Sequence, residues 1–250
     1  MLVPRQEVIA LVEMKTRRAQ LHLNVLEREI ATWLGLPPYT VTFEDDFDRA
    51  LQIWRIALQI APEAIPMSIG DFVCCLRSAL DQLAWGLAHL DLKRSFTERE
   101  ERNISFLIFN ERNSTYEDRR LLFPPAVADV FDSLQPYHGG HAYRDNPLWQ
   151  LNELWTLDKH RGVPINCNSL HVRFPMQGWE NYVRHFYDGI EVHFPLLRAW
   201  TSPADLKPSI SMEVLFGEYM GAFEVSLIRL REINDFVRNG VIPRFAGFFS

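Results

Sequence analysis

The sequence predicts an α+β fold, in which long helices pack as a bundle and the region 163–216 supplies an antiparallel sheet. Apolar residues recur at helical spacing in several long segments, and strand-like alternation appears mainly in residues 39–60 and 163–216. A content of 47% hydrophobic and 12% aromatic residues allows a sizeable core in 250 residues. No linker or repeat divides the chain, so we expect a single domain over residues 1–250. The bundle helices are expected at residues 5–35, 68–91, 124–135, 146–161 and 218–240.

The first helix is expected to end at Gly35, because Pro37 and Pro38 prevent its continuation. The segments "YTVTF" and "LQIWRIAL" then alternate like strands, joined by the acidic turn "EDDFDR". The next helix is expected to begin at Ser68, with Asp71 three residues on in an arrangement close to a capping box.

The middle of the chain is expected to mix loops with shorter elements. The charged run "KRSFTEREERN" is interpreted as a solvated loop, "ISFLIF" as a short strand and "HGGHAYRDN" as a loop. The helix at 146–161 has a cap at Asp145 or Asn146, proline in its first turn and Gly162 after its end. "SLHVRFP", "IEVHFP" and "SISMEVLF" are predicted strands, and the last helix is expected to stop at Pro243.

Two charges in the 68–91 helix indicate a polar site. Leu76, Leu80 and Leu83 form its apolar stripe, while Arg77 and Asp81 lie about 100° and 140° round from Leu76. The small residues beside these charges allow another element to approach closely, so each charge needs a partner. They are Gly70, Cys74, Ala84 and Ala88.

The apolar stripe of the 146–161 helix continues onto Asp158. We therefore predict that the two helices pack together and that Arg77 meets Asp158, with Asp81 completing the network. Arg77 and Asp81 are four residues apart and can also pair with each other, so Arg77 is expected to contact Asp158 or Asp81. This cluster is either structural, fixing which helices pack, or part of an open cleft with His160 or His138 nearby.

Other histidine groups were weighed as sites. His138 and His141 flank two glycines, and a solvated loop is favoured over a metal site. His160 and Glu153 lie two turns apart on one helix face and either share a ligand or face solvent. His171 and His193 would meet only if their strands are neighbours. We expect no cofactor and no metal, and no phosphate loop or dinucleotide fingerprint is present.

Composition limits the class of protein. The net charge of −6 argues against a broadly basic surface for nucleic acid. Three cysteines, two of them the adjacent Cys74 and Cys75, make a poor disulfide framework and favour a reducing cytoplasm. The first residues lack the order of a secretory signal, and no apolar run is long enough for a membrane helix.

The segments "LRSALDQLAW", "LQPY" and "DKHR" together resemble a widespread, uncharacterised group of bacterial proteins over roughly the middle 100 residues. The first segment also resembles the HEPN superfamily, whose members include RNA-cutting toxins and defence factors. Their active site pairs an arginine with a histidine four to six residues later, and it usually works as a dimer without metal. Arg77 fits the arginine, but Gln82 stands at the histidine position and cannot exchange a proton near neutral pH.

We therefore expect a non-catalytic intracellular bacterial protein that binds a partner or ligand through its helical bundle. The alternative is a HEPN-like, metal-independent ribonuclease in a toxin or phage-defence setting. A third hypothesis is an enzyme that uses Arg77, Glu153 and His160. A homodimer, an RNA partner and a protein partner all remain open, and no membrane partner is expected.

Overall fold

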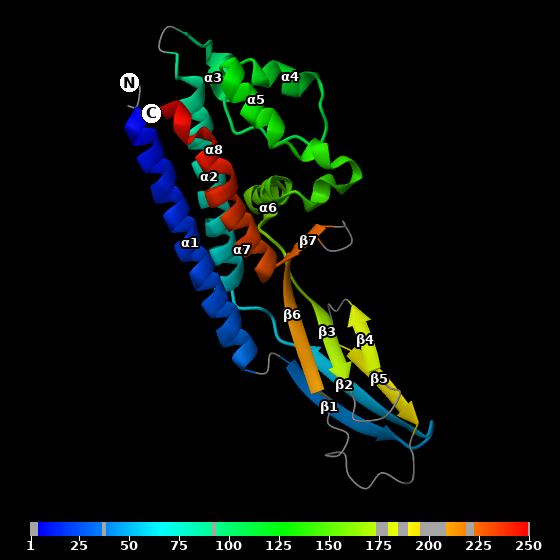
Figure 1. Ribbon diagram of the computed structural model, residues 1–250. Helices are drawn as coiled ribbons and strands as arrows, with labels where there is room; N and C mark the ends of the chain where they lie inside the picture. Colours follow the sequence, from blue (N-terminus) through cyan, green and yellow to red (C-terminus); the bar gives the residue numbers. More distant parts are fainter. Residues whose placement is uncertain are drawn as a thin grey trace.

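The computed structural model describes residues 5–36, 39–91, 94–173, 180–184, 190–195, 209–218 and 223–249. Within these ranges the chain forms a bundle of long helices, and two antiparallel sheets extend from one end of it (Figure 1). The predicted α+β class is confirmed. Among the described helices, none is both long and apolar enough to cross a membrane.

The longest two helices run side by side. Helix α1 (Arg5–Gly35) packs along α2 (Ala64–Ala88). The face of α1 toward α2 carries the apolar residues that repeat at helical spacing, from Val8 to Trp33, and they are buried. Gly86 lets the helices approach, because a Cβ there would meet the Val8 side chain.

Helix α2 begins one turn earlier than the sequence predicted. Ser68 is not its cap but a buried residue inside the helix. The helix starts at Ala64, with Pro66 in the first turn, where a missing N–H leaves no hydrogen bond unmade.

Short helices cover one side of α2. They are α3 (Glu98–Asn103), α4 (Ser114–Arg120), α5 (Pro125–Ser133), the 3-10 segment η1 (Pro136–Asp145) and α6 (Pro147–Arg161). The interpretation of 93–103 as a loop was wrong, because Thr97 and Glu100 form a capping box that starts α3. The interpretation of "HGGHAYRDN" as a loop was also wrong, since most of it is 3-10 helix.

Helix α6 has the predicted bounds. The Leu148 N–H donates to the Asn146 side chain at 2.8 Å, which identifies Asn146 as the cap. Gly162 follows the helix with φ 75°, a conformation that favours glycine. Residues of α6 pack against α2, as predicted.

Among the described residues, every strand pairing is antiparallel. One sheet has the order β1 (Tyr39–Asp46), β2 (Leu51–Leu58) and β5 (Ile190–Pro195). The other has the order β4 (Glu180–Arg184), β3 (Ile165–Arg173), β6 (Ser209–Glu218) and β7 (Phe223–Ser226). The strands of the 163–216 region thus divide between two sheets, because β5 pairs with β2.

The last helix was predicted to begin too early. Residues 223–226 pair with β6 as β7, and α7 (Leu227–Asp235) begins only after Ser226, whose side chain accepts a hydrogen bond from the Arg229 N–H at 3.3 Å. Met220, expected on this helix, lies outside the described residues. Pro243 does not stop the helical path either, because a π-helical segment (Phe236–Val241) leads into α8 (Ile242–Ala246) and a final 3-10 turn, Gly247–Phe249. Pro243 lies at the start of α8, a position where proline is tolerated.

The C-terminal segment folds back onto the bundle. Phe245 is fully buried and meets the rings of Phe106 and Phe131, with centroids 6.0 and 5.0 Å away. Phe249 is also buried and reaches Gly86 of α2. The core thus joins α1, α2, α5, α6 and the C-terminal helices.

Candidate functional site

The predicted strand "ISFLIF" is an extended segment with no strand partner in the described part of the chain. Side chains of α2 take the place of a partner strand. The Phe106 N–H donates to Asp81 Oδ1 at 2.9 Å, and Arg77 Nη2 donates to the Phe106 carbonyl at 3.1 Å. Arg77 Nη2 also lies 3.0 Å from Asp81 Oδ1. The two charges therefore hold both backbone groups of one residue.

Gln135 also holds this extended segment. Its Nε2 donates to the carbonyls of Leu107 and Phe131 at 2.9 and 2.8 Å. Its Oε1 accepts the Phe109 N–H at 2.9 Å. Gln135 is only 2% exposed, and both ends of its amide make hydrogen bonds. It thereby supplies partners to buried backbone groups, which are almost always paired in folded proteins. We call Arg77, Asp81 and Gln135 the backbone clamp.

Arg77 is the most unusual member of this clamp. It is only 6% exposed, and its Nε and Nη1 have no hydrogen-bond partner in the described part of the chain. The indole ring of Trp155 covers the guanidinium, 5.3 Å from ring centroid to Cζ. Burial lowers the pKa of Arg77, Asp81 acts against this, and the positive charge of Arg119 lowers the pKa further.

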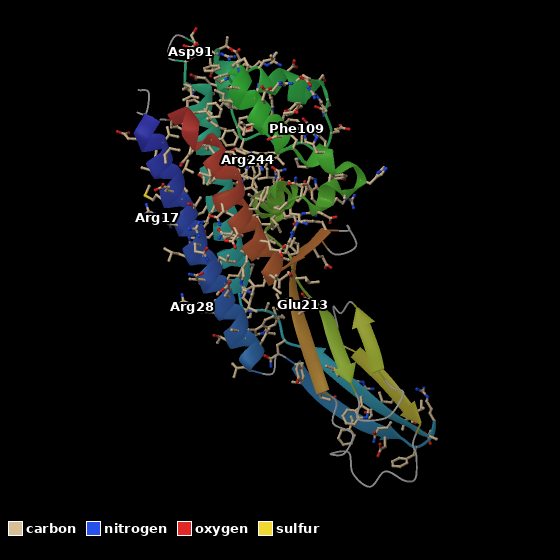
Figure 2. The ribbon with its side chains drawn as sticks, in the orientation of Figure 1. Arg17, Arg28, Asp91, Phe109, Glu213 and Arg244 are labelled. Carbon is tan, nitrogen blue, oxygen red and sulfur yellow. The ribbon has the colours of Figure 1, made fainter. Side chains whose placement is uncertain are left out.

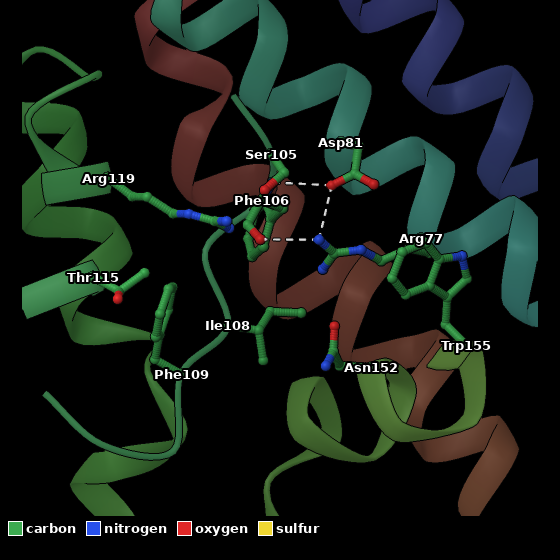
Figure 3. A pocket seen from close by; sticks show the side chains of 10 residues that line it. All are labelled: Arg77, Asp81, Ser105, Phe106, Ile108, Phe109, Thr115, Arg119, Asn152 and Trp155. Atoms are coloured by element: carbon green, nitrogen blue, oxygen red, sulfur yellow. Dashed lines mark hydrogen bonds and ion pairs between the residues drawn. The ribbon is translucent and has the colours of Figure 1, made fainter. Parts of the chain in front are cut away.

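A cavity of about 370 Å³ opens beside the clamp. Its walls come from α2, the extended segment, α4 and α6 (Figure 3). Arg119 and Thr115 face the clamp from α4, and Asn152 lies below Arg77 on α6. Phe109 lies among the short helices, well away from Glu213 on β6 (Figure 2). The residues lining the cavity are Arg77, Asp81, Ser105, Phe106, Ile108, Phe109, Thr115, Arg119, Asn152 and Trp155.

Of the two partners predicted for Arg77, Asp81 is confirmed and Asp158 was wrong. The partner of Arg77 is Asp81, while Asp158 lies against Gly70, where a Cβ would overlap its carboxylate. Burial raises the pKa of Asp158, and the neighbouring negative charge of Asp71 raises it further. Gly70 therefore permits the close approach of α6 to α2, as its small size predicted.

The other candidate residues do not reach the cavity. Glu153, Asp158 and His160 are absent from its walls, although all three lie on α6 with Trp155, and His160 is exposed. Arg77, Glu153 and His160 therefore do not line one cavity together, and the third hypothesis, an enzyme that combines them, gains no support from the cavity.

Of the histidine pairs considered as metal sites, only His138 and His141 have described side chains. His138 and His141 are both exposed. His171 lies on β3, which pairs with β4 and β6, whereas His193 lies on β5 in the other sheet. The side chains of His171 and His193 fall outside the described residues. Across the described ranges, no three histidine, cysteine or acidic side chains are grouped to hold a metal ion.

A polar cluster behind Phe109 fixes α4 and α5. The hydroxyl groups of Tyr116 and Tyr137 both donate to Asp132 Oδ1. Burial and this carboxylate raise the pKa of Tyr137. Burial also acts on Asp132, but the two hydrogen bonds leave the pKa of its carboxyl group below its ordinary value. The Tyr137 of "LQPY" therefore has a structural role, as does Gln135 beside it.

Several residues at the site could not be assigned from the sequence. Arg119 and Thr115 lie on α4, a helix that was not predicted. Asn152 and Trp155 were placed on α6 without a role. The only signal for α4 was Asn113, whose side chain caps the helix by accepting the Tyr116 N–H at 3.0 Å.

Comparison with known proteins does not assign the chain to a family. No family model matches the chain, and neither a curated protein nor a solved structure matches it significantly. The resemblance to the uncharacterised bacterial group and to the HEPN superfamily therefore stays a prediction.

Proposed function

We propose that this chain is a non-catalytic bacterial protein of the cytoplasm that binds a small organic ligand in the cavity beside the clamp. One observation carries the proposal: a nine-tenths buried arginine forms part of the wall and has two nitrogens without an acceptor. Unpaired buried donors are costly, and a ligand that binds beside this arginine is our explanation for a charged group at the cavity wall. A volume of about 370 Å³ lies in the usual range of small-molecule sites. The free thiols of Cys74 and Cys75 agree with a reducing compartment.

The chemistry of the cavity wall favours binding over catalysis. Its ionisable side chains are Arg77, Asp81 and Arg119. An arginine keeps its proton at any physiological pH, and Asp81 Oδ1 already accepts from Phe106 and Arg77. General acid–base catalysis needs a positioned group that changes its protonation state near the working pH. These three side chains are better suited to holding a ligand than to moving a proton.

The competing proposal is the HEPN-like ribonuclease. Gln82 does not line the cavity, and no imidazole does. We expect the purified protein to leave single-stranded RNA intact in the presence of a chelator, and Gln82→His to be the change that introduces any cleavage. Robust cleavage by the unaltered protein, lost in Arg119→Gln as well as in Arg77→Ala, would replace our proposal with this one.

A cavity-filling variant tests the binding proposal directly. Thr115 lines the cavity from α4, whereas its neighbour Ser114 does not, and both residues are exposed. Saturation-transfer NMR with a mixture of neutral and charged aromatic fragments should show binding to the unaltered protein. Thr115→Phe should lose this binding, while Ser114→Phe should keep it. Absence of binding to the unaltered protein, or equal loss in both variants, would contradict the proposal.

A further inference from the structure

We infer that the ligand of this cavity is a small aromatic carboxylate, whose acid group lies between Arg77 and Arg119 and whose ring lies against the apolar wall. This inference rests on the proposed function, because it names the ligand class of the same site. Four features of the wall support it, namely its charge, its neutral donors, its apolar side and its size.

The charges at the wall are unbalanced. Arg77 is partly neutralised by Asp81, but among the described residues no carboxylate pairs with Arg119. Both arginines line the cavity, and the Arg119 side chain extends toward Arg77 across it (Figure 3). An anion between the two guanidinium groups would offset their positive charge and would accept hydrogen bonds from Arg119.

Neutral hydrogen-bonding groups surround the same space. The side chains of Ser105, Thr115 and Asn152 line the cavity, and within the described ranges none makes a side-chain hydrogen bond. In Figure 3 the oxygen of the Asn152 amide is the end that points toward Arg77. Such groups can orient an oxygen acid that already lies beside two cations.

The rest of the wall is apolar and suits a ring. Ile108 and Phe109 form one side, and Trp155 contributes the edge beside Arg77. A ring that packs there loses contact with water and gains aromatic contacts. About 370 Å³ accommodates a ring with an acid group.

The net charge of the wall favours a carboxylate over a phosphate monoester. Two arginines and Asp81 leave one positive charge, which matches a monoanion. A phosphate monoester carries close to two negative charges at neutral pH, and the second would face Asp81 without a cation. A planar carboxylate also matches the geometry of a guanidinium group.

Three small probes of nearly the same shape test the charge preference. Benzoate is anionic, benzamide is neutral and benzamidine is cationic. Binding of each is measured by NMR titration of the unaltered protein, Arg119→Gln and Arg120→Gln. Arg120 is the matched control, because it pairs with Glu117 and Asp129 instead of lining the cavity. We expect benzoate to bind at least about tenfold more tightly than benzamide, and benzamidine to bind weakest.

The variants separate this inference from the proposed function. Arg119→Gln should remove most of the preference for benzoate over benzamide, and Arg120→Gln should keep it. If benzamide binds as well as benzoate and competes with it for the cavity, the inference is wrong and the proposed function stands. If no probe binds the unaltered protein, both are overturned.

Discussion

The pairing of Arg77 with Asp81 can be tested by two double-mutant cycles. The first combines Arg77→Met with Asp81→Leu, and the second combines Arg77→Met with Asp158→Leu. Each variant is measured by urea unfolding followed by circular dichroism, which gives the free energy of unfolding. The structure predicts strong coupling in the first cycle and almost none in the second.

The expected magnitudes follow from what each change leaves behind. Asp81→Leu leaves a buried guanidinium group without its carboxylate, and the Phe106 N–H without an acceptor. We expect a loss of about 3–5 kcal/mol. Arg77→Met leaves Asp81, whose side chain is 34% exposed and still accepts from the Phe106 N–H. Water screens this carboxylate, so the loss should be about 1–3 kcal/mol, mainly for the unpaired Phe106 carbonyl.

The double variant Arg77→Met/Asp81→Leu removes both charges. It should therefore lose less than the sum of the single variants, by about 1–3 kcal/mol. The Arg77/Asp158 cycle is the control, since Asp158 makes its contact with Gly70 instead, and its losses should add within about 0.5 kcal/mol. Coupling between Arg77 and Asp158 without coupling between Arg77 and Asp81 would refute the assignment.

Two further predictions concern stability. Because the pKa of Asp158 is raised in the folded state, its ionised form opposes folding at pH values above that pKa, and the effect disappears as pH falls toward the unfolded value of about 3.9. Asp158→Asn should therefore raise the melting temperature at pH 7, and the gain should shrink by pH 4. Asp118→Asn, on the exposed side of α4, is the control and should show no such gain. A gain in Asp158→Asn that does not depend on pH would contradict the prediction. Phe245→Ala should lower the free energy of unfolding in urea by about 3–5 kcal/mol, because the ring is fully buried. Arg244→Ala, at an exposed neighbour, should lower it far less. Equal small losses would show that the C-terminal segment does not stabilise the bundle.

Helices with strong local signals could be predicted from the sequence. Helix α6 has an asparagine cap, a proline at its first position and a glycine after its last residue, and its bounds were predicted to within a residue. Helix α1 was found as readily, because one face repeats apolar residues over its whole length. Helix α3 also carried a signal, the capping box of Thr97 and Glu100, but its high charge was interpreted as a solvated loop.

Elements that depend on distant partners could not be predicted in the same way. Phe223 lies at a position compatible with the apolar face of a helix, but it pairs in register with Glu218 of β6, and this contact makes it a strand residue. The strands of the 163–216 region divide between two sheets because β5 pairs with β2, which lies more than a hundred residues earlier in the chain. Helical periodicity and strand alternation report local preference, and tertiary pairing overrides it.

The extended segment at 104–109 also has partners that its own sequence does not reveal. Its apolar sequence indicated a strand, yet its backbone partners are side chains 25 to 29 residues away. No pattern within "ISFLIF" indicates that an arginine, an aspartate and a glutamine would replace a neighbouring strand. The need for partners was predictable, since buried backbone groups are almost always paired. Their identity was not.

The spacing of Arg77 and Asp81 explains why these two residue types stand on α2. Residues four apart share a helix face, so a donor and an acceptor at this spacing can reach the carbonyl and the N–H of one extended residue. Arginine before aspartate is the weaker order of charges on an isolated helix. Here the pair gains two hydrogen bonds to the Phe106 backbone. One nitrogen of Arg77 is sufficient for this structural role. The same side chain also lines the cavity, so Arg77 joins the structural role of the clamp to the proposed ligand site.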